Sequence, residues 1–259
     1  MTRFATWNVN SLNVRQSRVE EWIADVQPDI LCLQETKLAD EAFPALLFEA
    51  LGYESVHHGE GRWNGVAILS RVGLDGVVMN FADGADPDAE ARVVTATCGG
   101  ITVVNVYVPN GRSLDNDHYR YKLGWLDRLG KHIDAVTQPG DQMIIAGDFN
   151  IAPADIDVYS PEAFVGATHT SEPERDALAD IVGRGFDDVV RTRYPAIASV
   201  YSWWDYRRGD FHEGRGMRID LVLATKPVAD RVEWCVIDRN ARKGTLPSDH
   251  APVVVDLRD

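Results

Sequence analysis

Short apolar segments with the pattern of β-strands recur along the whole chain, and they restrict its fold more than any other feature. Early in the sequence they alternate with segments whose apolar residues have helical spacing, and later they follow one another around turns such as Gly99-Gly100. The strand segments are 3–9, 29–35, one within 61–70, 77–81, 91–97, 101–108, 144–148, 217–224 and a last one opened by the pair Asp249-His250. The helical segments are 14–26, 40–51, 115–136, one that starts within 171–175, and 186–194. This order predicts an α/β fold with antiparallel hairpins.

The chain has 259 residues and 45% hydrophobic content, which is enough to bury a large core. No linker-like tract rich in proline, glycine or serine interrupts it, so we expect one domain over residues 1–259. The sequence starts directly in a strand pattern, without a leader or an apolar run of membrane-spanning length, which predicts a cytoplasmic protein. Cys32, Cys98 and Cys235 lie far apart in apolar segments, so we expect buried thiols in a reducing compartment.

An aspartate and an asparagine follow the buried strand segment 144–148 at its end. Asp148 and Asn150 are two residues apart, between Gly147 and Pro153, and a period of two would place both side chains on one face. The pair suits a site that needs one proton acceptor and one neutral group that polarises an oxygen. A strand that simply ends in an Asx turn explains these residues equally well.

Other apolar segments also end in polar residues or contain them. Such groups destabilise a fold when they are buried without partners, so several of them at strand ends indicate a shared site. Taken alone, Glu35 is explained equally well as a helix cap or surface carboxylate, and His250 as part of a local turn. The residues concerned are Asn8, Asn10, Glu35, Tyr107, Asn110, Arg112, Asp220, Asp249 and His250.

The net charge argues against tight, non-specific binding to a polyanion. Forty acidic residues stand against 26 lysines and arginines, which gives a formal charge of −14. The distribution is uneven, however, because the segment 184–218 holds seven arginines against five acids, interleaved with aromatic residues that include Trp203 and Trp204. Arginines among aromatics are typical of nucleic-acid contacts, although an ordinary folded surface has the same composition as often.

Six motifs follow one another along the whole chain: Trp7-Asn8-Val9-Asn10, Leu33-Gln34-Glu35-Thr36-Lys37, Asn64-Gly65-Val66-Ala67-Ile68-Leu69-Ser70, Gly147-Asp148-Phe149-Asn150, Arg218-Ile219-Asp220 and Ser248-Asp249-His250. In this order they resemble the exonuclease III family of DNA repair nucleases, part of the endonuclease/exonuclease/phosphatase superfamily. The resemblance implies a single catalytic domain over residues 1–259. It also implies a four-layer α/β sandwich, with two mainly antiparallel sheets face to face, helices outside, and the active site at one edge where strand ends from both sheets meet.

The resemblance also implies a role for each site residue. Glu35 would be the principal ligand of Mg²⁺, for which Mn²⁺ is a possible substitute, and Asn8, Asn10 and Asp249 would hold or border the metal. Asp148 would activate the attacking water, and Asn150 would orient the scissile phosphate. Asp220 and His250 would form a carboxylate–imidazole pair that favours a cationic ring. Tyr107 and Asn110 would contact the phosphate, with Tyr107 a rival candidate for helping the nucleophile, and Trp203 would lie beside the pocket for a base-free or terminal sugar.

The expected substrate is duplex DNA with 3′ ends or abasic sites, bound by a monomer without a membrane partner. His169 occupies a point where relatives that cut inside a duplex often carry a small residue, so we expect attack at 3′ ends to outweigh incision at abasic sites. A surface histidine without a role is the alternative. We expect local arginines, together with Mg²⁺, to hold the DNA and to make binding strongly sensitive to salt; examples are Arg62, Arg112, Arg207, Arg215 and Arg218.

Two functions of other classes remain open from the sequence. A hydrolase of phosphoinositides, sphingomyelin or another small phosphoester would belong to the same superfamily, but its substrate-loop motifs differ and no segment resembles a membrane-binding helix. A non-catalytic DNA-binding module is the second alternative. It would have no reason to keep Glu35, Asp148, Asp220 and His250 together.

Overall fold

The computed structural model describes residues 1–138 and 140–259, and it contains two six-stranded sheets. The first sheet has the strand order β11 (Val232–Ile237), β12 (Val253–Leu257), β1 (Thr2–Asn8), β2 (Ile30–Gln34), β4 (Val66–Ser70) and β3 (Glu54–His58). The second has the order β5 (Asp75–Met79), β6 (Val93–Cys98), β7 (Ile101–Tyr107), β8 (Met143–Asp148), β10 (Asp220–Thr225) and β9 (Phe186–Asp188). Each sheet contains one parallel pair, β1–β2 or β7–β8, and its other pairs are antiparallel.

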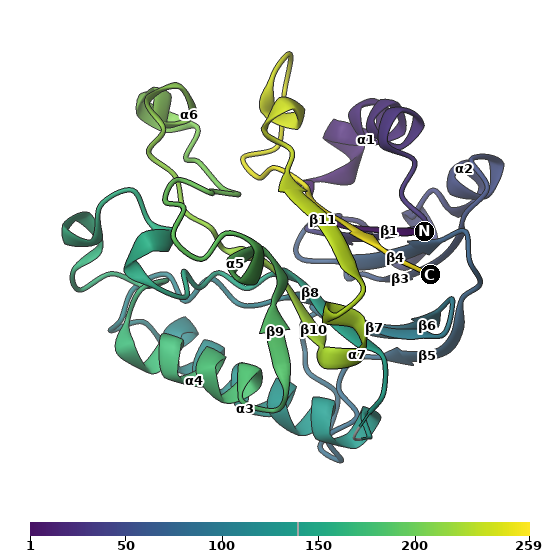
Figure 1. Ribbon diagram of the computed structural model, residues 1–259, viewed down its shortest axis with the longest axis horizontal. Coiled ribbons are helices and arrows are strands. Elements are labelled where there is room, and N and C mark those ends of the chain that lie inside the picture. The colour runs from purple at the N-terminus through teal and green to yellow at the C-terminus, as the bar shows by residue number, and fades with distance from the viewer. Residues whose placement is uncertain (139) are drawn as a thin grey trace.

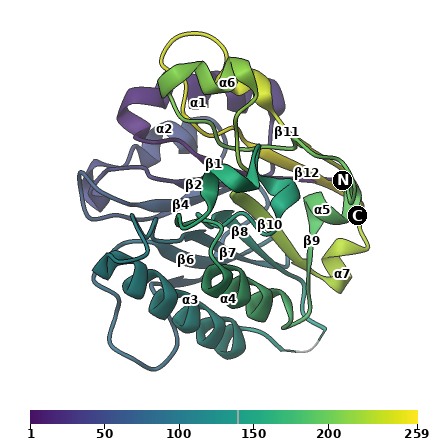
Figure 2. The same cartoon turned by 90° about the vertical axis from the view of Figure 1, so that its left-hand side faces the viewer.

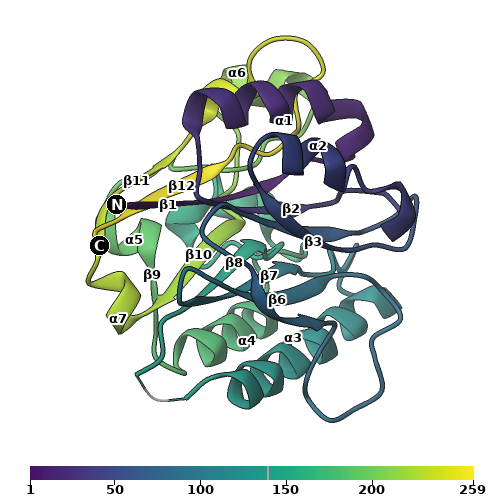
Figure 3. The ribbon, with the colours of Figure 1, turned by 90° about the vertical axis from the view of Figure 1, so that its right-hand side faces the viewer.

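Helices cover the outer face of each sheet, which completes four layers. Helices α1 and α2 lie on the first sheet, and α3 and α4 lie on the opposite side of the molecule against the second (Figure 1). The turned views show the same order of layers, and the two termini lie side by side in every view (Figures 2 and 3). The predicted sandwich of two mainly antiparallel sheets is confirmed. The helices are α1 (Leu12–Val26), α2 (Ala45–Ala50), α3 (Asp117–Val136), α4 (Glu172–Val182), α5 (Val189–Arg193), α6 (Asp210–Glu213) and α7 (Lys226–Ala229), with short 3₁₀ turns η1 (Asp40–Ala42), η2 (Asp155–Asp157), η3 (Pro161–Phe164), η4 (Arg207–Gly209) and η5 (Arg239–Arg242).

Alternation along the strands divides the apolar residues between separate cores. In β8, Ile144 faces the other sheet, whereas Ile145 packs under α3 and α4 with Leu126 and Leu129. Successive side chains of a strand point to opposite faces, so a sheet covered on both sides needs apolar residues at every position. This explains why the central strand segments are almost continuously apolar. Burying each large aliphatic side chain contributes roughly 1.5–3 kcal/mol.

A buried polar cluster joins the two sheets close to the ends of their strands. Gln34 of β2 donates its amide to Thr6 Oγ1 (2.9 Å) and to Asn105 Oδ1 (2.7 Å). The amide of Asn105, in β7, donates to the carbonyl oxygens of Leu33 (2.9 Å) and Ala67 (2.7 Å) in the facing sheet. Because buried amides are destabilising unless they are hydrogen-bonded, these bonds favour one alignment of the sheets. That alignment brings the carboxyl ends of β2 and β7 to the same edge.

The structure differs from the sequence prediction at the sheet edges. Strands β3 and β11 were not predicted, because both are edge strands in which polar or exposed residues break the apolar pattern. The predicted helix 186–194 is wrong at its start, since Phe186–Asp188 pair with β10 and Asp188 then caps α5 by accepting the Arg191 amide (3.0 Å). The predicted helix 40–51 is divided at Pro44 into η1 and α2, and the strand predicted at 77–81 begins at Asp75.

Candidate active site

Two carboxylates from different sheets meet at the edge where β2 and β8 end. The side-chain nitrogen of Asn8, at the end of β1, donates to Glu35 Oε1 (2.8 Å) and to Asp148 Oδ2 (2.9 Å). The oxygen of the same amide accepts the backbone N–H of Asn10 (2.9 Å). Asn8 is fully buried, so it holds both carboxylates at a fixed separation. The predicted convergence of the β1, β2 and β8 ends is therefore present in the structure.

The end of β8 is both an Asx turn and part of this site. Asp148 Oδ1 accepts the backbone N–H of Asn150 (2.9 Å), and Asn150 has a left-handed backbone with φ of 50°. The Asn150 side chain does not follow the period of a strand, yet its nitrogen lies 3.3 Å from Asp148 Oδ2 and donates to the Val108 carbonyl (2.9 Å). The two explanations left open by the sequence are therefore compatible, because the turn is what brings the two side chains together.

A histidine stands between Asp148 and a second buried acid. His250 Nδ1 lies 2.8 Å from Asp220 Oδ2, and its Nε2 lies 3.7 Å from Asp148 Oδ2. Burial lowers the pKa of His250, but the negative charges of Asp220 and Asp148 outweigh this effect and raise the pKa to about 10. The ring is therefore a cation at neutral pH, with one N–H held by Asp220 and the other directed toward the carboxylates.

Burial has the opposite consequence for the acid in this pair. It raises the pKa of Asp148 to about 7, with Asp220 and Glu35 adding to the rise and His250 opposing it. A carboxylate with a pKa near 7 is a far better proton acceptor at neutral pH than an exposed aspartate. Asp148 therefore has the environment of a general base, while Glu35, half-buried beside it, lies at the solvent side of the pair.

Glu35, Asp148 and His250 each offer an atom within 4.8 Å of the others, a spacing that fits a metal ion. The protonated ring of His250 has no free lone pair, so the two carboxylates are the available donors. Hard oxygen donors of this kind suit Mg²⁺ or Mn²⁺. Lys37 Nζ lies 2.9 Å from Glu35 Oε2 and also contacts Asn10. The sequence motif contains Lys37, but no role was predicted for it, and its position two residues after the site glutamate was the available signal.

Asn10, Asp249 and Trp203 form a border beside the carboxylates. Asp249 accepts hydrogen bonds from the Asn10 amide (3.0 Å) and from the indole N–H of Trp203 (3.1 Å). Trp203 is half-buried, and its neighbour Trp204 is fully buried in the core. The structure thus places Trp203 beside the carboxylates and Trp204 in the core.

Tyr107 ends β7 directly opposite Asp148 in the parallel register. Burial raises the pKa of its hydroxyl well above the usual range, and the neighbouring carboxylates of Glu35 and Asp148 raise it further, although Arg92 stacks 4.5 Å from the ring and opposes them. The hydroxyl therefore stays protonated and can donate a hydrogen bond. This environment disfavours Tyr107 as a proton acceptor for the nucleophile.

Three polar side chains from different loops form a cluster beside Asp148. Asn110 donates to Asn150 Oδ1 (3.1 Å), and His169 Nε2 lies 3.1 Å from both the Asn110 nitrogen and that same oxygen. Burial lowers the pKa of His169 to about 4, helped by the charge of Lys122, so the ring is neutral at pH 7. The structure therefore joins His169 to the predicted phosphate-contact residues.

Strained backbone marks the same set of residues. Asn10, Glu35, Asn150 and His169 all have left-handed backbones, with φ of 45°, 51°, 50° and 77°. Such conformations raise the energy of residues other than glycine and persist only when surrounding contacts hold them. Their occurrence in four residues at one edge indicates that placement of these side chains takes precedence over local stability.

The arginines expected to hold a polyanion divide into exposed and buried members. Arg112 is exposed at the rim, where its backbone N–H donates to Asn110 Oδ1 (3.1 Å). Arg207 and Arg215 pair with Asp205 and Asp210. The expectation for Arg218 is wrong: its side chain is fully buried and bonded to acids of η2 and β9, Asp157 (2.6 Å) and Asp188 (2.8 Å). The acids that hold Arg218 are distant in sequence, so their pairing could not be inferred from its surrounding motif.

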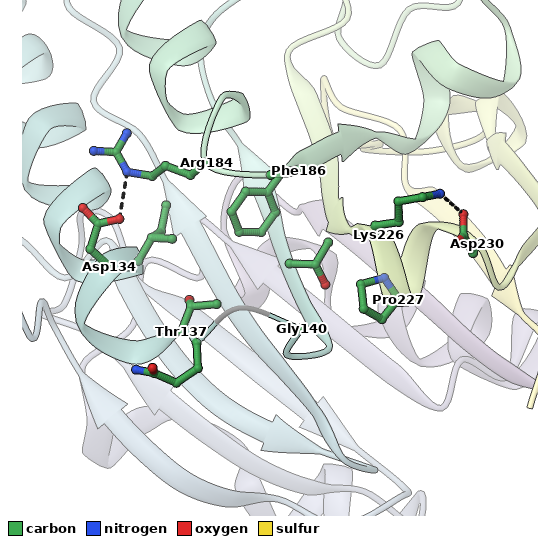
Figure 4. A pocket seen from close by; sticks show the side chains of 12 residues that line it. Asp134, Thr137, Gly140, Arg184, Phe186, Lys226, Pro227 and Asp230 are labelled. Carbon is green, nitrogen blue, oxygen red and sulfur yellow. Dashed lines mark hydrogen bonds and ion pairs between the residues drawn. The ribbon is translucent and has the colours of Figure 1, made fainter.

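A large cavity lies elsewhere, at the edge where β8 starts. It has a volume of about 680 Å³ and lies between the end of α3, β9 and α7. Its charged groups are already paired, Arg184 with Asp134 and Lys226 with Asp230 (Figure 4). None of the predicted site residues lines it. The candidate active site is therefore identified by its convergent polar groups and not by the volume of a cavity.

Comparisons with known proteins agree with this geometry. The profile of the Endonuclease/Exonuclease/phosphatase family matches residues 5–250. Exodeoxyribonuclease III of Haemophilus influenzae is 31% identical over 267 residues, which cover 99% of this chain and 100% of the relative. The structure of an AP endonuclease from Archaeoglobus fulgidus has a TM-score of 0.96 and 38% identity, with 100% of each chain covered. The 3′ phosphatase NExo from Neisseria, bound to a product DNA hairpin, gives the same TM-score, identity and coverage.

Proposed function

The chain belongs to the endonuclease/exonuclease/phosphatase family, as a DNA repair nuclease of the exonuclease III type, and we propose that it acts mainly at the 3′ ends of strands in duplex DNA. The observation that carries this proposal is the contact of His169 with Asn110 and Asn150, two side chains beside the general base. Abasic-site incision is a second, weaker activity in this proposal. Its support is the similarity to the AP endonuclease from Archaeoglobus fulgidus.

We propose Mg²⁺ as the cofactor, with Mn²⁺ as a substitute. Glu35 and Asp148 fit such an ion because their oxygens converge, and Asn8 fixes their separation. When bound, the cation would neutralise charge on the scissile phosphate and on the leaving oxygen. Asn10 and Asp249 border this position, and Lys37 limits the negative charge of Glu35. Asn8 orients the two carboxylate ligands, because its side-chain nitrogen donates a hydrogen bond to each of them.

The protein side chains support in-line hydrolysis of a phosphodiester. Asp148 accepts the proton of the attacking water, since burial raises its pKa to about 7. The His250 cation, held by Asp220, and the amide of Asn150 stabilise negative charge on the phosphate oxygens. Tyr107 and Asn110 donate further hydrogen bonds and orient the group for attack. Each of these groups occupies the same edge, so the phosphate can contact them together.

His169 gives the proposal its preference for strand ends. Its neutral ring lies against the two asparagines, where it would meet a strand that continues past the scissile phosphate. A strand that ends there leaves room for the ring and can accept a hydrogen bond from it. The Neisseria relative that shares this fold is a 3′ phosphatase and was captured with product DNA, which supports the same preference.

A substitution at this position tests the preference directly. We expect His169→Gly to raise the ratio of abasic-site incision to 3′-end removal, measured on matched end-labelled duplexes with a 3′ recess, a 3′-phosphate or one abasic site. Arg62→Ala, which changes an exposed residue outside the cluster, is the control for general effects on DNA binding. An unchanged ratio in His169→Gly contradicts the proposed role of the ring.

The same assay separates the alternative functions. An inositol phosphate is added to the panel, and every reaction is repeated with EDTA. Metal-dependent loss of the inositol phosphate alone would favour the small-phosphoester hydrolase, and inactivity on every substrate would favour a DNA-binding module.

The remaining expectations concern the state of the protein. In the part of the chain that the structure describes, no helix combines the length and the apolar character needed to cross a membrane. The proposal includes a cytoplasmic monomer with a single catalytic domain over residues 1–259. Its three buried, free cysteines suit a reducing compartment, and the core shared by both sheets suits one domain.

A further inference from the structure

A buried ion pair lies directly behind the cluster of Asn110, Asn150 and His169, and the reaction scheme above does not use it. Lys122 of α3 pairs with Glu174 of α4, and both side chains are 0% exposed. Both helices also contribute apolar side chains to one buried core, with Trp125, Leu126, Leu129, Leu178 and Ile181. Well-packed apolar residues stabilise such an interface at least as well as a buried ion pair does, so stability alone does not account for the charges.

The ammonium group of Lys122 joins the two loops that carry the site asparagines. Its Nζ donates to the backbone carbonyl of Asn150 (2.6 Å) and lies 3.5 Å from the carbonyl of Asn110. These loops follow β8 and β7, the parallel pair at the centre of the second sheet. A single cation therefore fixes the relative position of two side chains that the proposed function assigns to the phosphate.

The carboxylate of Glu174 holds the third loop. Its Oε1 accepts the hydroxyl of Thr168 (2.7 Å) and the backbone N–H of His169 (3.0 Å). Its Oε2 accepts the N–H (3.2 Å) and the hydroxyl (2.5 Å) of Ser171 at the start of α4. One side chain thus fixes the segment 168–171, and with it the position of the His169 ring.

Close packing at Gly111 leaves little freedom at this junction. A Cβ atom there would lie 2.8 Å from Thr168 Oγ1 and 3.2 Å from the side chain of Lys122. Gly111 also has a φ of 87°, which residues with a side chain rarely adopt. The three loops are therefore packed closely together, and the contacts between them are made by backbone atoms and by the buried ion pair.

We propose that Lys122 and Glu174 are positioning residues that hold Asn110, Asn150 and His169 as one unit and so set how the 3′ end of a DNA strand is seated. This inference rests on the proposed function, because it concerns the substrate preference of the same site. Neither residue touches the phosphate. Their effect passes through the carbonyl of Asn150 and the backbone of residues 168–171.

The test compares variants that separate charge, hydrogen bonding and stability. Lys122→Met/Glu174→Met removes both charges at similar volume, whereas Glu174→Gln keeps an oxygen for Thr168 and His169. Steady-state kcat and KM are measured with Mg²⁺ on the 3′-recessed and abasic duplexes, together with the melting temperature of each variant. We expect the double variant to lose about 10- to 100-fold in kcat on 3′ ends, because a small misplacement of phosphate contacts has effects of this size.

We further expect the ratio of 3′-end to abasic-site activity to fall in the double variant and to stay at the wild-type value in Glu174→Gln. Leu178→Ala is the matched control, since Leu178 is buried in the apolar core shared by α3 and α4 and its side chain has neither a charge nor a hydrogen-bonding group. It should lower the melting temperature and leave the ratio unchanged.

A double variant with the wild-type kcat and ratio overturns the inference. An equal shift of the ratio in Leu178→Ala also overturns it, because stability would then explain the effect. If the double variant does not fold, Glu174→Met replaces it in the comparison with Glu174→Gln, and equal ratios in those two variants overturn the inference. A wild-type protein without activity at 3′ ends contradicts the proposed function itself, which is a distinguishable result.

Discussion

His250 Nε2 lies 3.7 Å from Asp148 Oδ2. The pKa values of both groups are raised, and this gives the two groups opposite roles. Burial raises the pKa of Asp148 to about 7, and the carboxylates around His250 more than offset its burial and raise its pKa to about 10. Between these values the site contains a carboxylate base beside an imidazolium. This combination serves proton abstraction and charge stabilisation within one small volume.

The first prediction is a bell-shaped dependence of kcat/KM on pH. Activity should rise with pH through about 7, as Asp148 loses its proton, and fall near 10, as His250 loses its own. The two limbs belong to the coupled pair, and a bound cation favours the carboxylate. The acid limb should therefore move to lower pH as the Mg²⁺ concentration increases, measured on a 3′-recessed duplex. If the acid limb does not move with the Mg²⁺ concentration, Asp148 is not a ligand of the metal.

The second prediction concerns Asp220, whose Oδ2 holds His250 Nδ1 at 2.8 Å. Its charge is the main reason that the pKa of His250 is raised, so Asp220→Asn should move the alkaline limb toward neutral pH. Loss of the carboxylate that orients the imidazole of a Ser-His-Asp triad lowers kcat by about 10⁴-fold. The pH profile of the variant distinguishes this from simple misfolding, which lowers activity without moving the limb.

Most site residues were predictable because their signal is local in sequence. Glu35, Asp148 and His250 each follow or precede an apolar strand, and a strand end is a position that sequence reveals directly. Their meeting follows from topology, which only the six motifs together could indicate. The pairing of Lys122 with Glu174 was not predictable, because they are 52 residues apart and each resembles an ordinary polar helix residue. Edge strands such as β3 and β11 were missed because half-exposed strands lack an apolar pattern.

The third prediction concerns stability in acid. His132 is fully buried, its Nδ1 accepts the N–H of Ala82 (2.9 Å), and burial lowers its pKa from 6.5 to about 4. Between these two values the unfolded chain binds a proton at His132 and the folded chain does not. The free energy of unfolding should therefore decrease as the pH falls from about 6.5 to 4, by at most about 3 kcal/mol from this residue.

Urea unfolding at several pH values measures this effect. His132→Asn keeps an acceptor for the Ala82 amide and removes the titrating ring, so its stability should depend less on pH in this window. His212 is exposed on α6 and serves as the control, because His212→Asn should keep the wild-type slope. Equal slopes in wild type and His132→Asn would show that other groups control acid unfolding.

The fourth prediction contrasts two arginines that looked alike in the sequence. Arg218 is fully buried between Asp157 and Asp188, so Arg218→Met should lower the free energy of unfolding by about 3–5 kcal/mol, because it leaves Asp188 without this ion pair and leaves the buried Asp157 with Arg191 alone. Arg112 is exposed at the rim of the site. Arg112→Ala should leave stability unchanged and weaken DNA binding, and it should reduce the slope of log K against log salt by about 1 for one lost phosphate contact.

Fluorescence anisotropy with a 3′-recessed duplex, in Ca²⁺ or EDTA to suppress turnover, gives the salt slope for each variant, and chemical denaturation gives its stability. A chain with a formal charge of −14 can bind DNA only if a few exposed cations and the metal act locally, so each such arginine should have a large share of the salt dependence. If Arg112→Ala keeps the wild-type slope, the DNA path avoids the loop after β7. Attraction at the site would then depend on the metal and on the His250 cation.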